Sequence, residues 1–269
     1  MHTHSTFLLQ CAYGPPAAGV EKDVQQAAML FKKAAEQGHA QAQHDLGVMY
    51  VNGDGVEKDT QQAAIWFNTA AQQGNVHSHY ALGGMYQSGD GVEMDMQQAA
   101  IWYRKAAEQG YANAQNSLGV IYDVQEDMQQ AAIWYRKAAE QGHAHAPNNL
   151  AVMYANGADA EKDMQQATLW FNKAAEQGNA HAQCTLGCLY ANGDVVEKDP
   201  HQAAMWRRKA AEQGYANAQY NLGVIYVDGA GVERELNQAA KWLQKAARQG
   251  MVEARSQLMG VYEEMKQEM

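Results

Sequence analysis

Cysteine, proline and long apolar runs are all scarce in this chain of 269 residues. The three cysteines, Cys11, Cys184 and Cys188, are too few for a framework of paired disulfides, which favours a reduced, intracellular protein. The apolar run Phe7-Leu8-Leu9 is too short for a signal-peptide core, and no stretch approaches the roughly eighteen apolar residues of a membrane-spanning helix. These absences predict a cytoplasmic protein that does not insert into a membrane.

Positive charge is also scarce, with 20 Lys and Arg against 30 Asp and Glu, a formal net charge of −10. Affinity for nucleic acid depends largely on cationic contacts to phosphate, so no nucleic-acid partner is expected. The sequence has no nucleophile elbow, phosphate-binding loop or His-Glu-x-x-His zinc motif. Gly53-Asp54-Gly55 lacks the third glycine of a dinucleotide-binding turn and follows a helical pattern. The sequence therefore predicts no catalytic residue and no cofactor.

What the chain has in abundance is one short unit copied seven times. The block Lys-Ala-Ala-Glu-Gln-Gly, or a close variant, ends at Gly38, Gly74, Gly110, Gly142, Gly178, Gly214 and Gly250. Five of the intervals are 36 residues long and one is 32. A fixed period between about 20 and 50 residues is typical of a solenoid of stacked supersecondary units.

Each copy contains two helical patterns, which we name after their most regular residues. In the second copy, the apolar positions of residues 60–73 recur at helical spacing around Trp66, and this is the Trp helix. Asp59 is placed to cap its start, with Gln62 completing a capping-box-like pair, and Gly74 suits the left-handed residue that ends it.

The second pattern, over roughly residues 75–88, is the Leu-Gly helix. Leu82 lies on its apolar face, and Gly83 beside it leaves room for a neighbouring helix to approach closely. Gly89 and Gly91 then supply the positive φ angles that a turn to the next Trp helix needs.

These residues resemble the Sel-one-like repeat family, a relative of the tetratricopeptide repeats. The resemblance rests on the pattern Ala42-x-x-x-Leu46-Gly47-x-x-Tyr50-x-x-Gly53-x-Gly55-Val56-x-x-Asp59-x-x-x-Ala63-x-x-Trp66-x-x-x-Ala70-Ala71-x-x-Gly74, and it covers about residues 20–262. The resemblance implies an all-α, right-handed superhelix with the Leu-Gly helices on its concave side and the Trp helices on its convex side.

We expect one continuous solenoid domain. Residues 1–22 would form a degenerate half-repeat and loop, residues 23–250 the repeat array, and residues 251–269 a capping helix. The loop between Tyr122 and Asp127 is four residues shorter than its counterparts, so the stacking there is expected to differ.

Two repeated features admit a functional reading, but a structural one is favoured. The six Trp residues at one helical position, from Trp66 to Trp242, could form an aromatic ligand ladder, but packing between helices is the preferred interpretation. The Glu-Lys-Asp triplets at 21–23, 57–59, 161–163 and 197–199 could form an acidic stripe for a basic partner. Loop charges whose Asp caps the next helix are favoured instead.

Histidine and cysteine suggest one metal-binding alternative. His181, Cys184 and Cys188 follow each other at i, i+3 and i+7 on one Leu-Gly helix, and His145 holds the equivalent position of His181 one repeat earlier. Soft transition metals favour such ligands. No metal site is predicted, however, because helix-spaced Cys is usually a small buried hydrophobe and the spacing is not that of a zinc loop.

Two classes of function remain open. The first, which we favour, is a non-catalytic scaffold that binds a partner protein or peptide on an extended curved surface. The second is an enzyme, because secreted, cysteine-stapled members of the family that this chain resembles are associated with weak β-lactam hydrolysis. The scarcity of cysteine and the absence of a signal peptide count against this second class.

The seven copies can be compared position by position to find a binding surface. Five residues before the recurring Leu of each copy is a first variable column: Gln41, His77, Asn113, His145, His181, Asn217 and Glu253. Two residues before it is a second column: His44, Tyr80, Asn116, Asn148, Cys184, Tyr220 and Ser256. Neutral drift of exposed positions would also explain the variation. As a hypothesis, we assign partner binding to His77, Tyr80, Asn113, Asn116, His145, Asn148, His181, Asn217 and Tyr220, whose polar groups can hydrogen-bond to a peptide.

Overall fold

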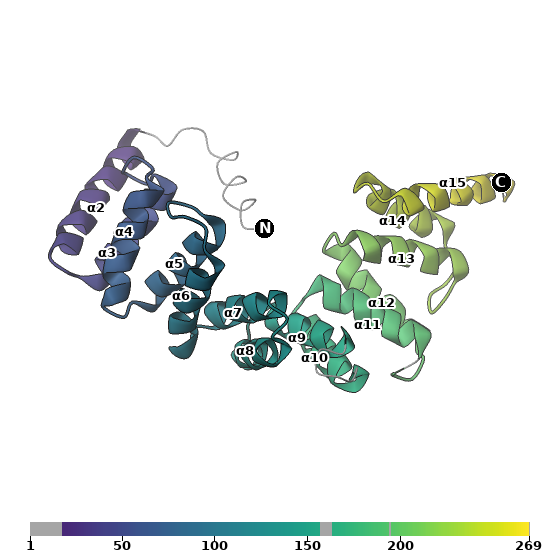
Figure 1. Cartoon of the computed structure of the whole chain (residues 1–269). Helices are drawn as coiled ribbons and strands as arrows, with labels where there is room; N and C mark the ends of the chain where they lie inside the picture. The colour runs from purple at the N-terminus through teal and green to yellow at the C-terminus, as the bar shows by residue number, and fades with distance from the viewer. Residues whose placement is uncertain (1–17, 157–162, 194, 269) are drawn as a thin grey trace. The chain divides into compact units, whose positions relative to one another are not determined.

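The computed structural model describes residues 18–156, 163–193 and 195–268, in which all regular structure is α-helical (Figure 1). The helices are α2 (Ala18–Glu36), α3 (Ala40–Asn52), α4 (Thr60–Gln72), α5 (Val76–Ser88), α6 (Met96–Glu108), α7 (Ala112–Val124), α8 (Met128–Glu140), α9 (Ala146–Asn156), α10 (Met164–Glu176), α11 (Ala180–Asn192), α12 (Pro200–Glu212), α13 (Ala216–Asp228), α14 (Leu236–Arg248) and α15 (Val252–Gln267). Residues 1–17 of the expected half-repeat, and part of the triplet at 161–163, lie outside the described residues.

The chain divides into two compact units, Met1–Ile121 and Tyr122–Met269. Within each unit, helices adjacent in sequence pack on one another, and a Leu-Gly helix packs most extensively on the Trp helix that follows it, as α3 does on α4 and α11 on α12. Packing between sequence neighbours is the solenoid principle, so the predicted all-α solenoid class is confirmed. The division falls beside the shortened Tyr122 to Asp127 loop.

The Trp helices α4, α6, α8, α10 and α12 begin at capping aspartates, as the sequence predicts. Asp59 Oδ1 accepts hydrogen bonds from the backbone N–H groups of Gln61 and Gln62, both at 3.0 Å, which satisfies donors that the first helical turn leaves unpaired. The expected capping box is wrong in its second half, because the Asp59 amide donates to the Tyr50 carbonyl at 3.0 Å. Asp23 also departs from the prediction, because α2 starts at Ala18 and Asp23 lies inside it.

Two glycines show why side chains are excluded at particular points of the second repeat. A Cβ at Gly83 of α5 would lie 2.5 Å from Cδ1 of Tyr103 on α6, so glycine lets the two helices approach closely. Gly91 has φ of +76°, and a Cβ there would lie 2.2 Å from the Thr60 carbonyl oxygen. A side chain at Gly91 would therefore meet both backbone strain and a steric clash.

The tryptophans belong to the packing between helices. Trp134, Trp206 and Trp242 are buried, in agreement with the structural interpretation of the Trp positions. The lysine three residues after a Trp covers the ring, as where Lys105 Nζ lies 4.0 Å from the ring centroid of Trp102. This cation–π contact joins neighbours on one helix face and leaves the rings little room to bind a ligand.

A buried amide contact, which we call the glutamine clamp, joins successive repeats. Gln183 on α11 donates from Nε2 to the carbonyl of Ala175 on α10 at 3.0 Å and accepts from Gln213 Nε2, at the end of α12, at 2.8 Å. Three consecutive helices are thus linked through one side chain. Gln43 and Gln219 make the same pair of contacts, with Gln73 and Gln249 as donors.

The clamp position is not a glutamine in three repeats, and in the last of them it is the exposed Arg255 of α15. His79 replaces the glutamine on α5, and its Nδ1 lies 3.1 Å from Gln109 Nε2. Pro147 replaces it in the fourth repeat. In α11 the backbone amide of Gln183 donates to the Asn179 carbonyl at 3.0 Å, and proline has no N–H with which to make the equivalent bond. Helix α9 accordingly begins two residues later than its counterparts and has 11 residues where they have 13.

The shortened loop keeps one contact of the longer ones and strains another residue. The Asp127 amide still donates to the Tyr122 carbonyl at 2.9 Å, as Asp59 does to Tyr50. To close the shorter path, Glu126 takes φ of +62°, the sole positive φ of a non-glycine residue in the described ranges. A left-handed backbone at a residue with a Cβ costs about 1–2 kcal/mol.

Candidate interaction surface

The two variable columns both reach the surface of the Leu-Gly helices. The first column is exposed at all seven positions, from Gln41 to Glu253. The second is half-buried at five positions, buried at Cys184 and exposed at Ser256. The recurring Leu that follows both columns is buried in six of the seven copies, and Leu46, Leu118, Leu150, Leu186 and Leu222 all have 0% exposure. Positions that vary between copies therefore coincide with accessible surface.

In the first unit, aromatic and imidazole rings from successive repeats touch along this surface. His77 lies with its ring centroid 5.8 Å from that of His44 and 5.2 Å from that of Tyr111. The Tyr80 ring lies 5.1 Å from Tyr111. Asn113 donates from Nδ2 to the Tyr111 hydroxyl at 3.1 Å. The predicted residues of this unit thus form a contiguous row, and the half-buried Asn116 lies on the same helix as Asn113.

In the second unit, amide and imidazole groups make the equivalent contacts. Asn148 Oδ1 lies 2.9 Å from His181 Nδ1, which joins the second column of one repeat to the first column of the next. His145 Nδ1 lies 3.5 Å from Asn179 Nδ2. His181 also approaches Tyr215 edge-on, with 6.2 Å between ring centroids.

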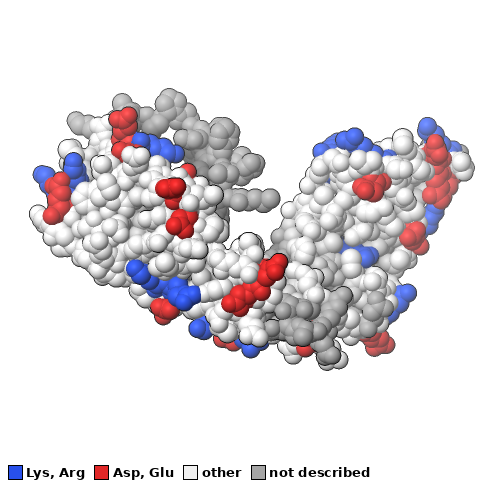
Figure 2. Space-filling model, viewed as in Figure 1, with Lys and Arg blue, Asp and Glu red and all other residues white. Residues whose placement is uncertain are grey.

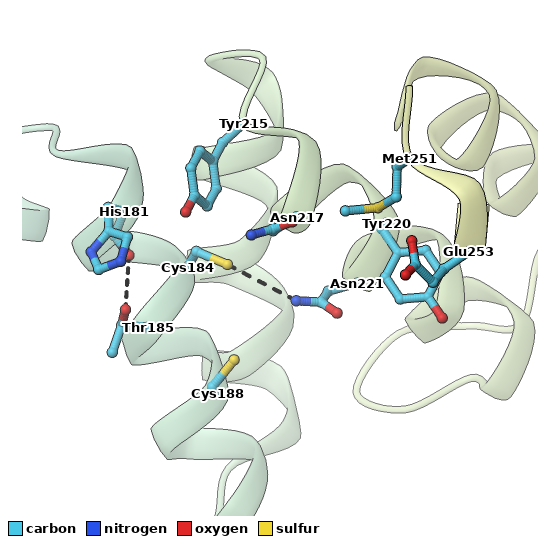
Figure 3. Close-up of a pocket in the computed structure, with 10 residues that line it drawn as sticks. All are labelled: His181, Cys184, Thr185, Cys188, Tyr215, Asn217, Tyr220, Asn221, Met251 and Glu253. Carbon is cyan, nitrogen blue, oxygen red and sulfur yellow. Dashed lines mark hydrogen bonds between the residues drawn. The ribbon is translucent and has the colours of Figure 1, made fainter. Parts of the chain in front are cut away.

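Three consecutive Leu-Gly helices of the second unit enclose an open pocket of about 400 Å³ (Figure 3). The first-column residues His181, Asn217 and Glu253 line it from α11, α13 and α15, and Tyr220 of the second column lines it from α13. The complete lining is His181, Cys184, Thr185, Cys188, Tyr215, Asn217, Tyr220, Asn221, Met251 and Glu253. The lining is rich in groups that both donate and accept hydrogen bonds.

The comparison of columns missed part of this lining. Tyr215 and Met251 occupy the position directly after the closing glycine of a repeat, and Tyr111 holds that position in the first unit. The signal was present in the sequence, because this position also varies from copy to copy. A comparison restricted to the helical pattern does not include this position, because the residue precedes the helix.

Two thiols line the pocket, and a guanidinium group lies next to one of them. Cys184 and Cys188 are both unpaired by disulfide, and Arg207 on α12 donates from a terminal nitrogen to Cys188 Sγ at 3.5 Å. The hydrogen bond from Cys184, together with the nearby Arg207, lowers the pKa of Cys188 well below its ordinary value, although burial opposes this. The same bond raises the pKa of Cys184, which keeps its proton.

The weak metal-ligand candidates do not converge. His145 and His181 face Asn179 and Asn148, whereas Cys184 and Cys188 contact each other and Arg207. Within the described ranges, no three His, Cys, Asp or Glu side chains are grouped so that they could hold a metal ion. No observation on these residues favours the β-lactam hydrolase alternative either.

Charge and hydropathy add two general findings. On the face drawn in Figure 2, basic and acidic side chains are interspersed among larger areas that carry no formal charge. None of the helices in the described part of the chain is long and apolar enough to cross a membrane.

These features define an all-α repeat protein of the helix-pair solenoid class. The chain belongs to the Sel1 repeat family, whose model matches residues 11–39, 40–75, 76–111, 112–143, 144–179, 180–215 and 216–251. Sel1 repeat proteins are typically scaffolds for protein interaction. No curated protein matches the chain in sequence.

Two solved structures support the family assignment. The first is c5321, a protective antigen present in uropathogenic Escherichia coli strains and displaying an SLR fold, which is 40% identical with a TM-score of 0.80. The match covers 88% of this chain but only 52% of the Escherichia coli protein. The second is a Sel1 repeat protein from Oxalobacter formigenes, 32% identical with a TM-score of 0.73, where the match covers 84% of this chain and 92% of the other.

Proposed function

We propose that this protein is a non-catalytic scaffold whose Leu-Gly helices bind a partner protein or peptide through the two variable columns. The observation that carries the proposal is the coincidence of sequence variation with accessible surface. The recurring Leu and Ala-Ala positions are largely buried and do not change between copies, whereas the exposed positions of the Leu-Gly helices differ. Extended surfaces of this kind are what repeat proteins use for recognition.

The pocket on α11, α13 and α15 is the part of this surface best suited to hold a partner side chain. Asn217 and Tyr220 present an amide and a phenol there, and Tyr215 adds a second ring. Amides can pair with the backbone of an extended peptide, and phenol rings contribute contact area at a small entropic cost. The remaining predicted residues, in both units, would contact other parts of the partner.

Site-specific photo-crosslinking can locate the binding surface. A photoreactive phenylalanine analogue at Tyr220 should crosslink to a partner in the native cell extract, and the same analogue at Leu169, exposed on α10, should not. The crosslinked protein is identified by mass spectrometry and then purified for binding measurements. A partner that crosslinks equally from both positions would count against the Leu-Gly surface.

Affinity measurements with the purified partner complete the test. The triple variant Asn217→Ala, Tyr220→Ala, Glu253→Ala should bind at least about tenfold more weakly, a loss of about 1.4 kcal/mol. The matched control changes the same exposed position of three consecutive Trp helices, with Leu169→Ala, Met205→Ala and Lys241→Ala. The proposal fails if the triple variant, verified as folded by circular dichroism, binds as tightly as the parent or if only the control weakens binding.

A further inference from the structure

The fifth Leu-Gly helix and the Trp helix after it depart from the repeat at three positions that touch one another. Among the seven recurring Leu-Gly helices, the position of Cys188 is otherwise Val or Gly, and the position of Cys184 is Cys only here. Arg207 stands where the other Trp helices have Phe31, Phe67, Tyr103, Tyr135, Phe171 and Leu243. The three exceptions are therefore confined to one place in the fold and share one cluster of contacts.

Arg207 is oriented toward the thiols. Its carbon chain lies against the backbone of α11, since a Cβ at Gly187 would be 2.5 Å from Arg207 Cγ. A terminal nitrogen donates to Cys188 Sγ at 3.5 Å, whereas Nε is buried and has no hydrogen-bond partner among the described residues. Within the described ranges, no carboxylate forms an ion pair with Arg207. A half-buried guanidinium without an anionic partner favours the thiolate form of Cys188.

Cys184 has a different part in the cluster. It is only 7% exposed, and the Asn221 side-chain amide approaches its Sγ at 4.0 Å. Its thiol lies one helical turn before Cys188, and the interaction between the two thiols lowers the pKa of Cys188 and raises that of Cys184. A donor of this kind stabilises a thiolate at Cys188 while Cys184 itself remains protonated.

We infer that Cys188 is a nucleophilic thiol site, open to the pocket on α11, α13 and α15, that captures a small peptide-like disulfide as a mixed disulfide. The thiolate Sγ attacks one sulfur of the small disulfide, and the new sulfur–sulfur bond forms as the old one breaks. The other sulfur leaves with the electron pair as a thiolate. The small disulfide is itself the oxidant, so no further reagent is needed.

The pocket supplies the reason for this class of substrate. Its volume of about 400 Å³ falls within the usual range of small-molecule sites. Besides Cys188, the lining includes His181, Asn217 and Tyr220, which can hydrogen-bond to the amide and carboxylate groups of a peptide-like thiol. This inference does not depend on the proposed partner binding, since it concerns a small molecule and a covalent bond.

Oxidised glutathione is a suitable probe, applied to the 269-residue chain with Cys11→Ser so that only Cys184 and Cys188 remain. Intact-mass measurement should show one glutathionyl group, and fragmentation should place it on Cys188. Cys188→Ser should abolish the addition. Cys184→Ser, which keeps a hydroxyl donor, should still be modified at Cys188. Addition at Cys184, or a rate no faster than that of a short unstructured cysteine peptide, would overturn the inference.

The role of Arg207 is tested by its replacement with the residue that the next repeat uses. Arg207→Leu, which introduces the side chain found at Leu243, should slow the addition at least about tenfold near pH 6, and the difference should close at alkaline pH where both proteins hold a thiolate. Ultraviolet thiolate absorbance over the same pH range gives an independent readout of Cys188 ionisation, together with circular dichroism as a check of folding. An Arg207→Leu protein that is folded but unchanged in both readouts would refute the role of Arg207.

Discussion

The glutamine clamp makes a sharp prediction about what holds successive repeats together. Gln183→Leu keeps a side chain of similar size but removes the donor to the Ala175 carbonyl and the acceptor for Gln213. Gln183 is only 4% exposed, so water cannot replace either hydrogen bond without opening the interface. The Ala175 carbonyl retains the bond from the Gly178 amide at 3.0 Å, so it is not left wholly unsatisfied.

The magnitude follows from the number of bonds. Each of the two hydrogen bonds contributes about 0.5–1.5 kcal/mol net, so the substitution should destabilise the α10–α13 region by about 2 kcal/mol. The leucine side chain adds buried apolar area at the same place. The expected loss of stability therefore lies near the middle of the range for two hydrogen bonds and not at its top. A loss of this size corresponds to a roughly thirtyfold fall in protection of amide hydrogens in these helices.

Native-state hydrogen exchange is the appropriate assay because a repeat array can open locally. The matched control is Gln165→Leu, an exposed glutamine on α10 at which the same chemical change should alter protection little. If Gln183→Leu and Gln165→Leu gave equal protection in α10 through α13, the clamp would contribute nothing and the reasoning would be wrong.

Three further outcomes follow from individual residues. Pro147→Gln should lengthen α9 and let Gln177 reach a clamp partner, which raises the stability of that region by about 1 kcal/mol in hydrogen exchange; a shorter or less protected α9 would contradict this. Burial, and to a smaller extent the charge of Lys105, lowers the pKa of His79 below its ordinary value of 6.5. The stability that neutral His79 contributes is therefore fully present above pH 6.5 and is lost as the pH falls through the folded-state pKa. The melting temperature of His79→Gln should therefore fall less than that of the parent when the pH is lowered from about 7 to about 5. Parallel curves of melting temperature against pH would refute the role of His79 as an acceptor. Glu126→Gly should stabilise the protein by about 0.5–1 kcal/mol in thermal unfolding, because glycine takes the positive φ without strain but is more flexible when unfolded; a destabilised variant would show that the side chain matters more than the backbone.

Much of the fold was determined by the sequence alone. The helix pairs, their ends near Thr60 and Gly74, and the capping role of Asp59 follow from patterns within a few residues, which each copy repeats. Such signals are reliable because caps and apolar periodicity act locally and seven copies point to the same arrangement. The first and second columns also emerged from the sequence, since a residue that must pack at every interface cannot vary as exposed positions do.

Only the tertiary structure decided which distant side chains meet. The clamp joins Gln183 to Gln213, 30 residues away, and Arg207 reaches Cys188 across 19 residues. The pocket requires three helices that periodicity treats as separate units. Local sequence patterns specify which face of a helix is buried, but the angle and register at which helices cross depend on packing against their neighbours. Those crossings place the Cys188 thiol beside a guanidinium group and leave room for a ligand next to it.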